Sequence, residues 1–146
     1  YWPIFSFAPA ATIWWQNVRA LIVGLVLGIF SFGILGILPL FVTLAIVGYL
    51  YQIMLINGLP AATIITALIL PHGIVEIPAA IIATAAVISA GAKMATPTST
   101  ETFGETWMRS ISDWTKVMIG VVMPLLIAAA LLETWLTPRI AMLFLK

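Results

Sequence analysis

The sequence places its one histidine and a glutamate four residues apart, inside a long apolar stretch. His72 and Glu76 stand between Pro71 and Pro78, and Gly73 follows the histidine. Four residues is one helical turn, so both side chains share a face wherever this segment is helical. An imidazole beside a carboxylate can relay protons, bind an ion or metal, or act as a base. This pair is the first candidate site.

A structural role for the pair is the favoured interpretation. The two side chains would satisfy each other and the backbone groups that Pro71 and Pro78 set free, and so fix one helix arrangement. A metal site needs three or four ligands, whereas the chain has one His, no Cys and no His-Glu-x-x-His motif. We therefore expect no metal and no cofactor; a proton relay or an ion site stays open.

Three further polar residues stand near the ends of predicted spans. Asn17 and Arg19 open the first apolar segment, and Glu133 lies near the end of the last one. With an even number of spans both segment ends fall on the same side of the membrane. We expect an Arg19–Glu133 ion pair that clamps the first helix to the last; the alternative is that each side chain reaches the interface separately.

Asn57 and Gly58 form a turn signal ahead of Pro60. We expect the amide of Asn57 to serve this turn. The alternative is that it lines a polar pocket together with His72.

Composition indicates a membrane protein. Hydrophobic residues make up 63% of the 146 residues and charged residues 8%, where soluble domains carry about 25% charged residues. The net charge of +1 excludes a strongly basic nucleic-acid surface. The chain shows neither a nucleophile elbow nor a glycine-rich phosphate loop, so we expect no catalytic residue and no enzyme.

Apolar segments predict an all-α, polytopic transmembrane bundle that forms one domain over residues 1–146. A spanning helix needs about 20 apolar residues. We expect spans at about 17–35 and 38–56, separated by a turn. A third span over 73–92 follows a half-helix over 61–70, the helix being broken at Pro71, Gly73 and Pro78. A fourth span covers about 117–136 and ends at Thr137-Pro138.

Residues 101–116 predict an amphipathic helix on the membrane surface, after a loop over 96–100. Aromatic and apolar residues recur there at helical spacing, with charged residues around the other face. It alone offers mixed charge and aromatics, so it is the expected partner-facing element. The residues expected to face partners are Glu105, Trp107, Arg109, Asp113 and Trp114.

Gly24 and Gly28 form a G-x-x-x-G pattern in the first span. This spacing lets two helix backbones approach closely. We expect packing within the chain, with homodimerisation as the alternative.

Three motifs, in order, resemble the stage II sporulation protein M family of integral membrane proteins. The first is Asn17-x-Arg19 at the entry to an early span. The second is Asn57-Gly58 followed by Pro71-His72-Gly73-x-x-Glu76-x-Pro78. The third is Glu133 followed by Thr137-Pro138. Together the motifs extend over nearly the whole chain.

The resemblance implies a membrane scaffold. Named members of the family take part in forespore engulfment, where the protein holds peptidoglycan-degrading partners and is not thought to be the hydrolase. We therefore expect a non-enzymatic, multi-pass subunit of the cell membrane that contacts the lipid bilayer and binds other membrane or envelope proteins, but no nucleic acid. The alternative is a small transporter or channel with its polar site at His72 and Glu76; an intramembrane enzyme is a third, less favoured class.

Overall fold

The computed structural model describes residues 7–96 and 102–144, and this part of the chain is helical without any strand. Four of its helices are long and apolar enough to cross a membrane, which confirms the predicted all-α bundle. The elements in chain order are α1 (Phe7–Phe30), the 3₁₀ turn η1 (Ile34–Ile37), α2 (Leu38–Ile56), α3 (Ala61–Ala95), α4 (Phe103–Val117), the π-helical η2 (Met118–Val122), α5 (Met123–Leu131), the π-helical η3 (Leu132–Leu136) and α6 (Thr137–Phe144).

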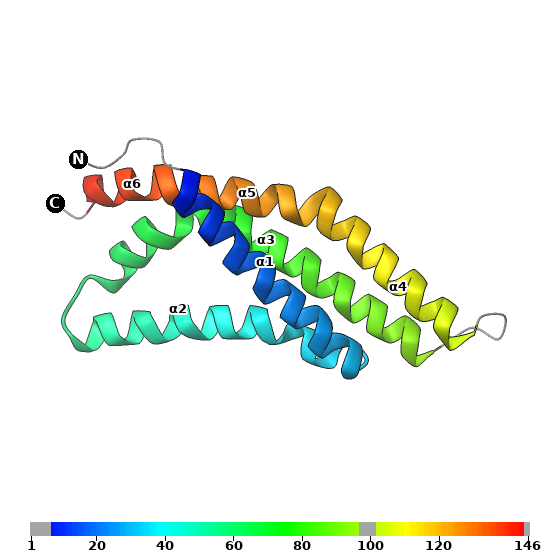
Figure 1. Cartoon of the computed structure of the whole chain (residues 1–146). Coiled ribbons are helices and arrows are strands. Elements are labelled where there is room, and N and C mark those ends of the chain that lie inside the picture. The colour runs from blue at the N-terminus through cyan, green and yellow to red at the C-terminus, as the bar shows by residue number, and fades with distance from the viewer. Residues whose placement is uncertain (1–6, 97–101, 145–146) are drawn as a thin grey trace.

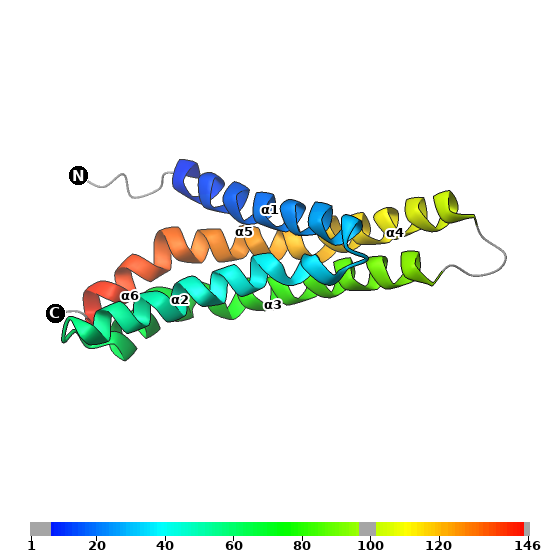
Figure 2. The same ribbon diagram turned by 90° about the horizontal axis from the view of Figure 1, so that it is seen from below.

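The long helices run back and forth along one axis (Figures 1 and 2). The elements from α4 to α6 form one helix, Phe103–Leu143, of 41 residues. At 1.5 Å per residue it is about 60 Å long, twice the hydrocarbon thickness of about 30 Å. The α3–α4 hairpin extends past the turn between α1 and α2 in both views. A bilayer of that thickness therefore cannot cover the full length of the helix Phe103–Leu143.

The turn between the first two spans lies where glycine and proline predict it, and α2 has the bounds expected for it. α1 begins earlier than expected, at Phe7, and ends at Phe30. The end of α1 has a local cause, because Phe32 and Gly33 adopt positive φ angles of 52° and 94°. Two consecutive left-handed residues cannot continue a right-handed helix.

The predicted break in the third span is wrong. α3 is one helix of 35 residues with Pro71 and Pro78 inside it. Figure 1 shows that its first turns run at an angle to the remainder, so α3 bends where a break was expected. A proline removes one backbone hydrogen bond and kinks a helix. A full break would leave several backbone groups without partners in hydrocarbon, at several kcal/mol each.

The expected end of the last span at Thr137-Pro138 is also wrong, since the helix continues as α6. Each π-helical segment ends two residues before a proline: η2 before Pro124 and η3 before Pro138. The wider π turn accommodates the proline ring and its missing donor without ending the helix.

The amphipathic segment is a helix, but it does not lie on the membrane surface as a separate element. α4 packs along α3 and continues directly into η2 and α5. Lys93 Nζ lies 3.1 Å from Asp113 Oδ2 and joins the two helices. The expected loop over 96–100 extends from Thr96 into 97–101, which lie outside the described residues, as does Glu101 of the predicted helix.

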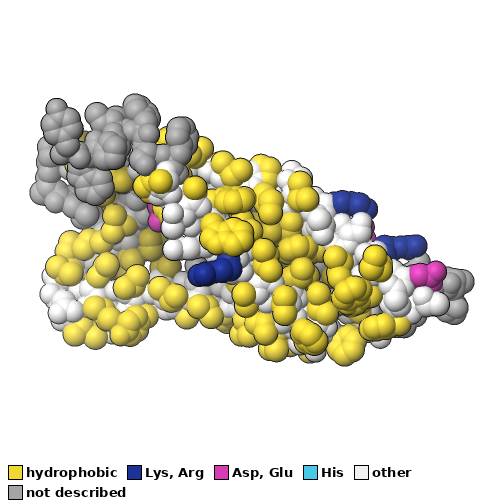
Figure 3. All heavy atoms as spheres, viewed as in Figure 1, with side chains coloured by type: hydrophobic (Ala, Val, Ile, Leu, Met, Phe, Trp, Pro, Cys, Tyr) yellow, Lys and Arg dark blue, Asp and Glu magenta, His cyan; other side chains and the backbone are white. Residues whose placement is uncertain are grey.

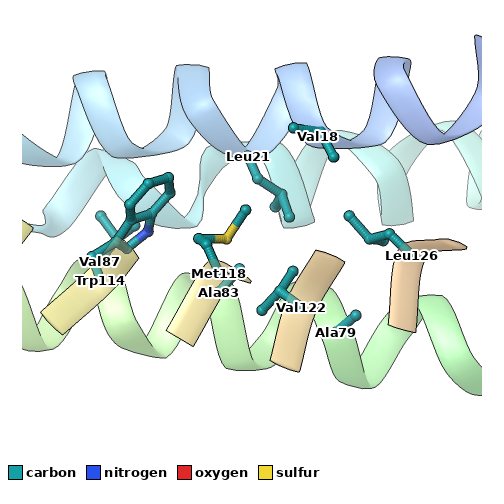
Figure 4. Packing of buried hydrophobic residues seen from close by; sticks show 9 residues of the cluster. All are labelled: Val18, Leu21, Ala79, Ala83, Val87, Trp114, Met118, Val122 and Leu126. Atoms are coloured by element: carbon teal, nitrogen blue, oxygen red, sulfur yellow. The ribbon is translucent and has the colours of Figure 1, made fainter. Parts of the chain in front are cut away.

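A narrow core runs between α1, α3 and the last long helix (Figure 4). α3 contributes small residues, while α1 and the last helix contribute larger ones. The members are Val18, Leu21, Ala79, Ala83, Val87, Trp114, Met118, Val122 and Leu126. Small side chains on one helix let neighbouring backbones come close, which is how spans associate where lipid offers no hydrophobic drive.

The outer surface is hydrophobic over most of its extent. Figure 3 shows apolar side chains across the visible face, and most charged groups gather at the end where α4 begins. α2 has no buried residue at all, and its uncovered side chains include Phe41 and Ile46. A soluble protein would not expose such a surface, whereas a bilayer covers it.

The G-x-x-x-G pattern of α1 is used within the chain. A Cβ on Gly24 would come 2.8 Å from Pro39 Cγ, and one on Gly28 would overlap Val87. Gly36 makes the same close approach to Val87 from η1. These glycines let α1, η1 and α3 meet at backbone distance, which is the packing role expected from the sequence.

Gly91 of α3 offers a direct test of the close approach between α3 and the turn that follows α1. A Cβ there would overlap the backbone of Phe32 and Gly33, which cannot move aside as a flexible side chain would. We expect Gly91→Ala to destabilise the protein by about 1–3 kcal/mol, the usual cost of overpacking. Unfolding by SDS in mixed micelles measures this. Gly48→Ala is the control, because nothing lies within 4 Å of its Cβ position; equal stability of the two variants would contradict this close approach.

Candidate functional site

The bend of α3 carries the two ionisable residues singled out from the sequence. Both lie on one face of the helix, with His72 Nε2 4.0 Å from Glu76 Oε2. Their side chains are 13% and 22% exposed, so both are largely withdrawn from the surface. The prolines on either side bend α3 here without interrupting it. The helix therefore holds the imidazole and the carboxylate at a fixed spacing.

Glu133 joins this pair from the last long helix. One ligand atom each of His72, Glu76 and Glu133 lies within 4.8 Å of the other two. Glu133 belongs to the π-helical segment η3, which packs against α3. Two elements thus bring one imidazole and two carboxylates to one point. We refer to these three residues as the His–Glu–Glu cluster.

The expected Arg19–Glu133 clamp is absent from the described ranges 7–96 and 102–144. Arg19 is exposed on α1, one residue beyond the buried Val18. Successive helical residues point about 100° apart, so Arg19 faces away from the core that Val18 enters. Glu133 instead faces His72 and Glu76. The prediction failed because neither residue lies at the end of its helix and because the two side chains point to different neighbours.

Thr137 completes the site, and the sequence analysis did not single it out. Its Oγ1 lies 3.4 Å from His72 Nδ1 and donates to the Leu132 carbonyl at 3.3 Å. Thr137 stands four residues after Glu133, and this spacing was the signal that could have found it. The contact with Thr137 occupies Nδ1, so Nε2 is the ring nitrogen that faces Glu76.

The cluster needs positive charge. An unprotonated Nε2 and two carboxylates would place three electron-rich groups within 4.8 Å. Two unit charges at that distance repel by roughly 3 kcal/mol at an effective dielectric constant of about 20. A proton or a cation between these groups removes the repulsion. The cluster can therefore hold a proton or bind a cation. In either case the shared positive charge would also hold α3 against η3.

A small cavity adjoins Glu76. Its polar lining comes from Asn17 of α1, Thr43 of α2 and Glu76, and its volume is about 30 Å³. That is enough for one water molecule with polar partners. Asn17 thus lies at the site, as its polarity at membrane depth suggested.

Asn57 lies apart from the cluster. Its Nδ2 donates to the Ile53 carbonyl at 2.8 Å, and Gly58 follows with a φ of 71°. The side chain is exposed and serves the turn between α2 and α3. The structure therefore assigns Asn57 the turn role expected for it, with no contribution to a pocket beside His72.

The residues expected to face partners fall into two groups. Glu105 closes a capping box with Thr102, and Asp113 pairs with Lys93 and Lys116, so these charges support the hairpin. Trp114 is only 9% exposed and belongs to the core. Its assignment to a partner surface is wrong, because α4 packs on α3 through the face that carries it.

Trp107 and Arg109 are both exposed on α4, as are Phe103 and Met108. Because successive helical residues point about 100° apart, Trp107 and Arg109 lie on roughly opposite sides of the helix. The exposed surface of α4 thus carries apolar and basic groups.

Comparison with known proteins bears on the whole arrangement. The family model for stage II sporulation protein M matches residues 5–138. The chain belongs to this family. No curated protein and no solved structure gives a significant match. The match covers all four long helices, the His–Glu–Glu cluster and Thr137. Together with the apolar helices it makes the chain a multi-pass membrane protein.

A double-mutant cycle distinguishes the observed cluster from the expected clamp. We expect His72→Gln and Glu133→Gln to couple by about 0.5–3 kcal/mol in unfolding free energy, because the two side chains share one site. For Arg19→Gln and Glu133→Gln, the changes in unfolding free energy of the two single variants should sum to that of the double variant within about 0.5 kcal/mol, because the two side chains share no contact. SDS unfolding of the single and double variants gives both terms. Stronger coupling to Arg19 than to His72 would contradict the geometry.

Proposed function

We propose that this chain is a non-enzymatic scaffold of the cell membrane that holds other membrane or envelope proteins. The observation that supports the proposal is the α3–α4 hairpin, which extends past the turn between α1 and α2 (Figure 1) and carries exposed apolar groups. Phe103, Trp107 and Met108 are uncovered there. Aromatic side chains and Met beside Arg are the residues enriched in protein interfaces.

The hairpin is built as a rigid platform. A capping box at Thr102 begins α4, with the Thr102 amide donating to Glu105 Oε2 at 2.8 Å. Asp113 links α4 to Lys93 of α3 at 3.1 Å. Trp114 fills the space between the helices at the base. A rigid surface loses little conformational entropy when a partner docks, which favours binding.

Membership in the stage II sporulation protein M family is consistent with this role, since the resemblance implies a scaffold for peptidoglycan-degrading partners. The site chemistry agrees as well. The His–Glu–Glu cluster links α3 to η3, which suits it to joining helices. We therefore expect the chain to contact the lipid bilayer and to bind partner proteins.

The test uses point variants on α4, because deleting the helix would also remove Trp114 from the core. We expect Trp107→Ala with Met108→Ala to reduce co-purification of partners by tenfold or more, as truncation of an interface anchor costs about 2 kcal/mol. The assay is quantitative mass spectrometry of the full chain purified mildly from its native membrane.

Ile119→Ala is the matched control for that experiment. Ile119 lies on the same long helix and is 61% exposed, close to the 66% of Met108, but it stands in the uncharged part of the span. Partner recovery should be unchanged in this variant. Equal recovery from the α4 variant and the wild type would reject the hairpin as the docking surface.

A second function, ion or proton transport, draws on the cavity beside Glu76. Its volume of about 30 Å³ admits a water molecule or a bare ion but no larger solute. If the chain transports such an ion, Glu76→Gln should abolish flux in liposomes, because it removes one charge from both the cavity and the cluster. Glu105→Gln is the control, outside the cluster. Wild-type liposomes without flux above empty ones would exclude this function.

A further inference from the structure

We propose that the His–Glu–Glu cluster binds one divalent transition-metal cation of the Zn²⁺ type, which ties α3 to the last long helix. This differs from the expectation of no metal, which rested on a shortage of ligands. The sequence offered His72 and Glu76 as two neighbouring ligands, and Glu133 was assigned to Arg19. The structure supplies Glu133 as the third.

The spacing of the donors suits such an ion. The three ligand atoms lie within 4.8 Å of one another. A tetrahedral Zn²⁺ with ligands at about 2.0–2.1 Å holds its donors about 3.4 Å apart. Rotation about the flexible side-chain torsions of the two glutamates closes that difference without moving either helix. The three residues are each half-buried, so an ion there would be largely shielded from water.

The histidine is oriented as a ligand. His72 Nδ1 lies 3.4 Å from Thr137 Oγ1, and Nε2 lies 4.0 Å from Glu76 Oε2, so Nε2 is the nitrogen that faces the carboxylates. Metal-binding histidines are typically held in this way, with the second ring nitrogen donating to a nearby acceptor. Thr137 is itself 6% exposed and anchored to the Leu132 carbonyl, so it is well placed as a positioning residue.

Charge and donor type favour a transition metal. Two carboxylates carry a charge of −2, and a divalent cation makes the site neutral at membrane depth, where uncompensated charge is costly. An imidazole nitrogen suits Zn²⁺ and similar ions, whereas Mg²⁺ and Ca²⁺ prefer oxygen ligands alone. Three protein ligands leave a fourth position for a water molecule.

The backbone departs from regular helix at both sources of ligands. α3 is bent (Figure 1) and carries Pro71 next to His72, and η3 is π-helical where it carries Glu133. Insertions of π-helix recur at functional sites, because the extra residue redirects a side chain. Here it directs Glu133 at α3.

The experiment measures zinc on the full chain, purified in detergent through a tag without histidine. After chelation and dialysis, titration with ZnCl₂ should give one Zn²⁺ per chain and raise the thermal unfolding temperature. MgCl₂ and CaCl₂ should do neither. X-ray absorption of the bound zinc should show nitrogen and oxygen donors with one imidazole.

Variants assign the ligands. Thr137→Val should weaken zinc affinity by about 10–100-fold, the usual loss when the partner of a metal-binding histidine is removed. Glu133→Gln should weaken it further. Asp113→Asn, a carboxylate change on the same long helix outside the cluster, should leave affinity unchanged.

Two results would overturn the proposal. One is a wild-type chain that binds no Zn²⁺, or binds it without an imidazole donor; this result needs no variant to fold. The other is full zinc affinity in a folded Glu133→Gln protein. Neither outcome affects partner docking on α4, so failure of the zinc site and failure of the scaffold remain distinguishable.

Discussion

The structure depends on the requirement that backbone polar groups inside a bilayer be satisfied by the helix itself. Each unsatisfied group costs several kcal/mol in hydrocarbon. This explains why four prolines within the long helices, Pro71, Pro78, Pro124 and Pro138, interrupt none of them. α3 responds by bending, and the last helix responds with two π-helical segments. In water either helix could have ended at these positions, because solvent would have satisfied the free carbonyls.

The same π-helical segments decide which face of the last helix meets the bundle. Every fourth residue from Thr106 to Ala130 is buried. In a straight α-helix a step of four residues turns the face by about 40°, so six steps would rotate it by roughly 240°. Winding around α3 and the added residue of the π turn absorb this rotation. Val122 and Leu126, which follow the π turn, thus stay buried in the same core as Met118.

The features that neighbouring residues determine, such as helix ends and close glycine packing, were predicted correctly from the sequence. α2 was placed correctly because Pro39 and Asn57-Gly58 mark its ends, and the glycines of α1 pack as their spacing indicated. The polar site was predicted only in half. His72 and Glu76 lie one turn apart on a single helix, so spacing alone brought them together. Glu133 was paired with Arg19 because an even number of spans puts both on the same side of the membrane, but the number of spans does not decide which face of its helix Glu133 occupies.

The cluster and the core have complementary tasks in holding α3 to the last helix. Toward the hairpin, small residues on α3 let the helices pack closely, and Ala79, Ala83 and Val87 contact the larger side chains opposite. Nearer its N-terminus α3 bends (Figure 1), yet it still packs against η3 and α6. Apolar packing alone gives little specificity among lipid tails of equal polarity. Glu76, one turn before Ala79, begins the polar contact at this point. A directional link between charged groups fixes the register of two helices, whereas apolar contacts alone would let one helix slide along the other. The cluster provides this link between α3 and the last long helix next to the bend of α3.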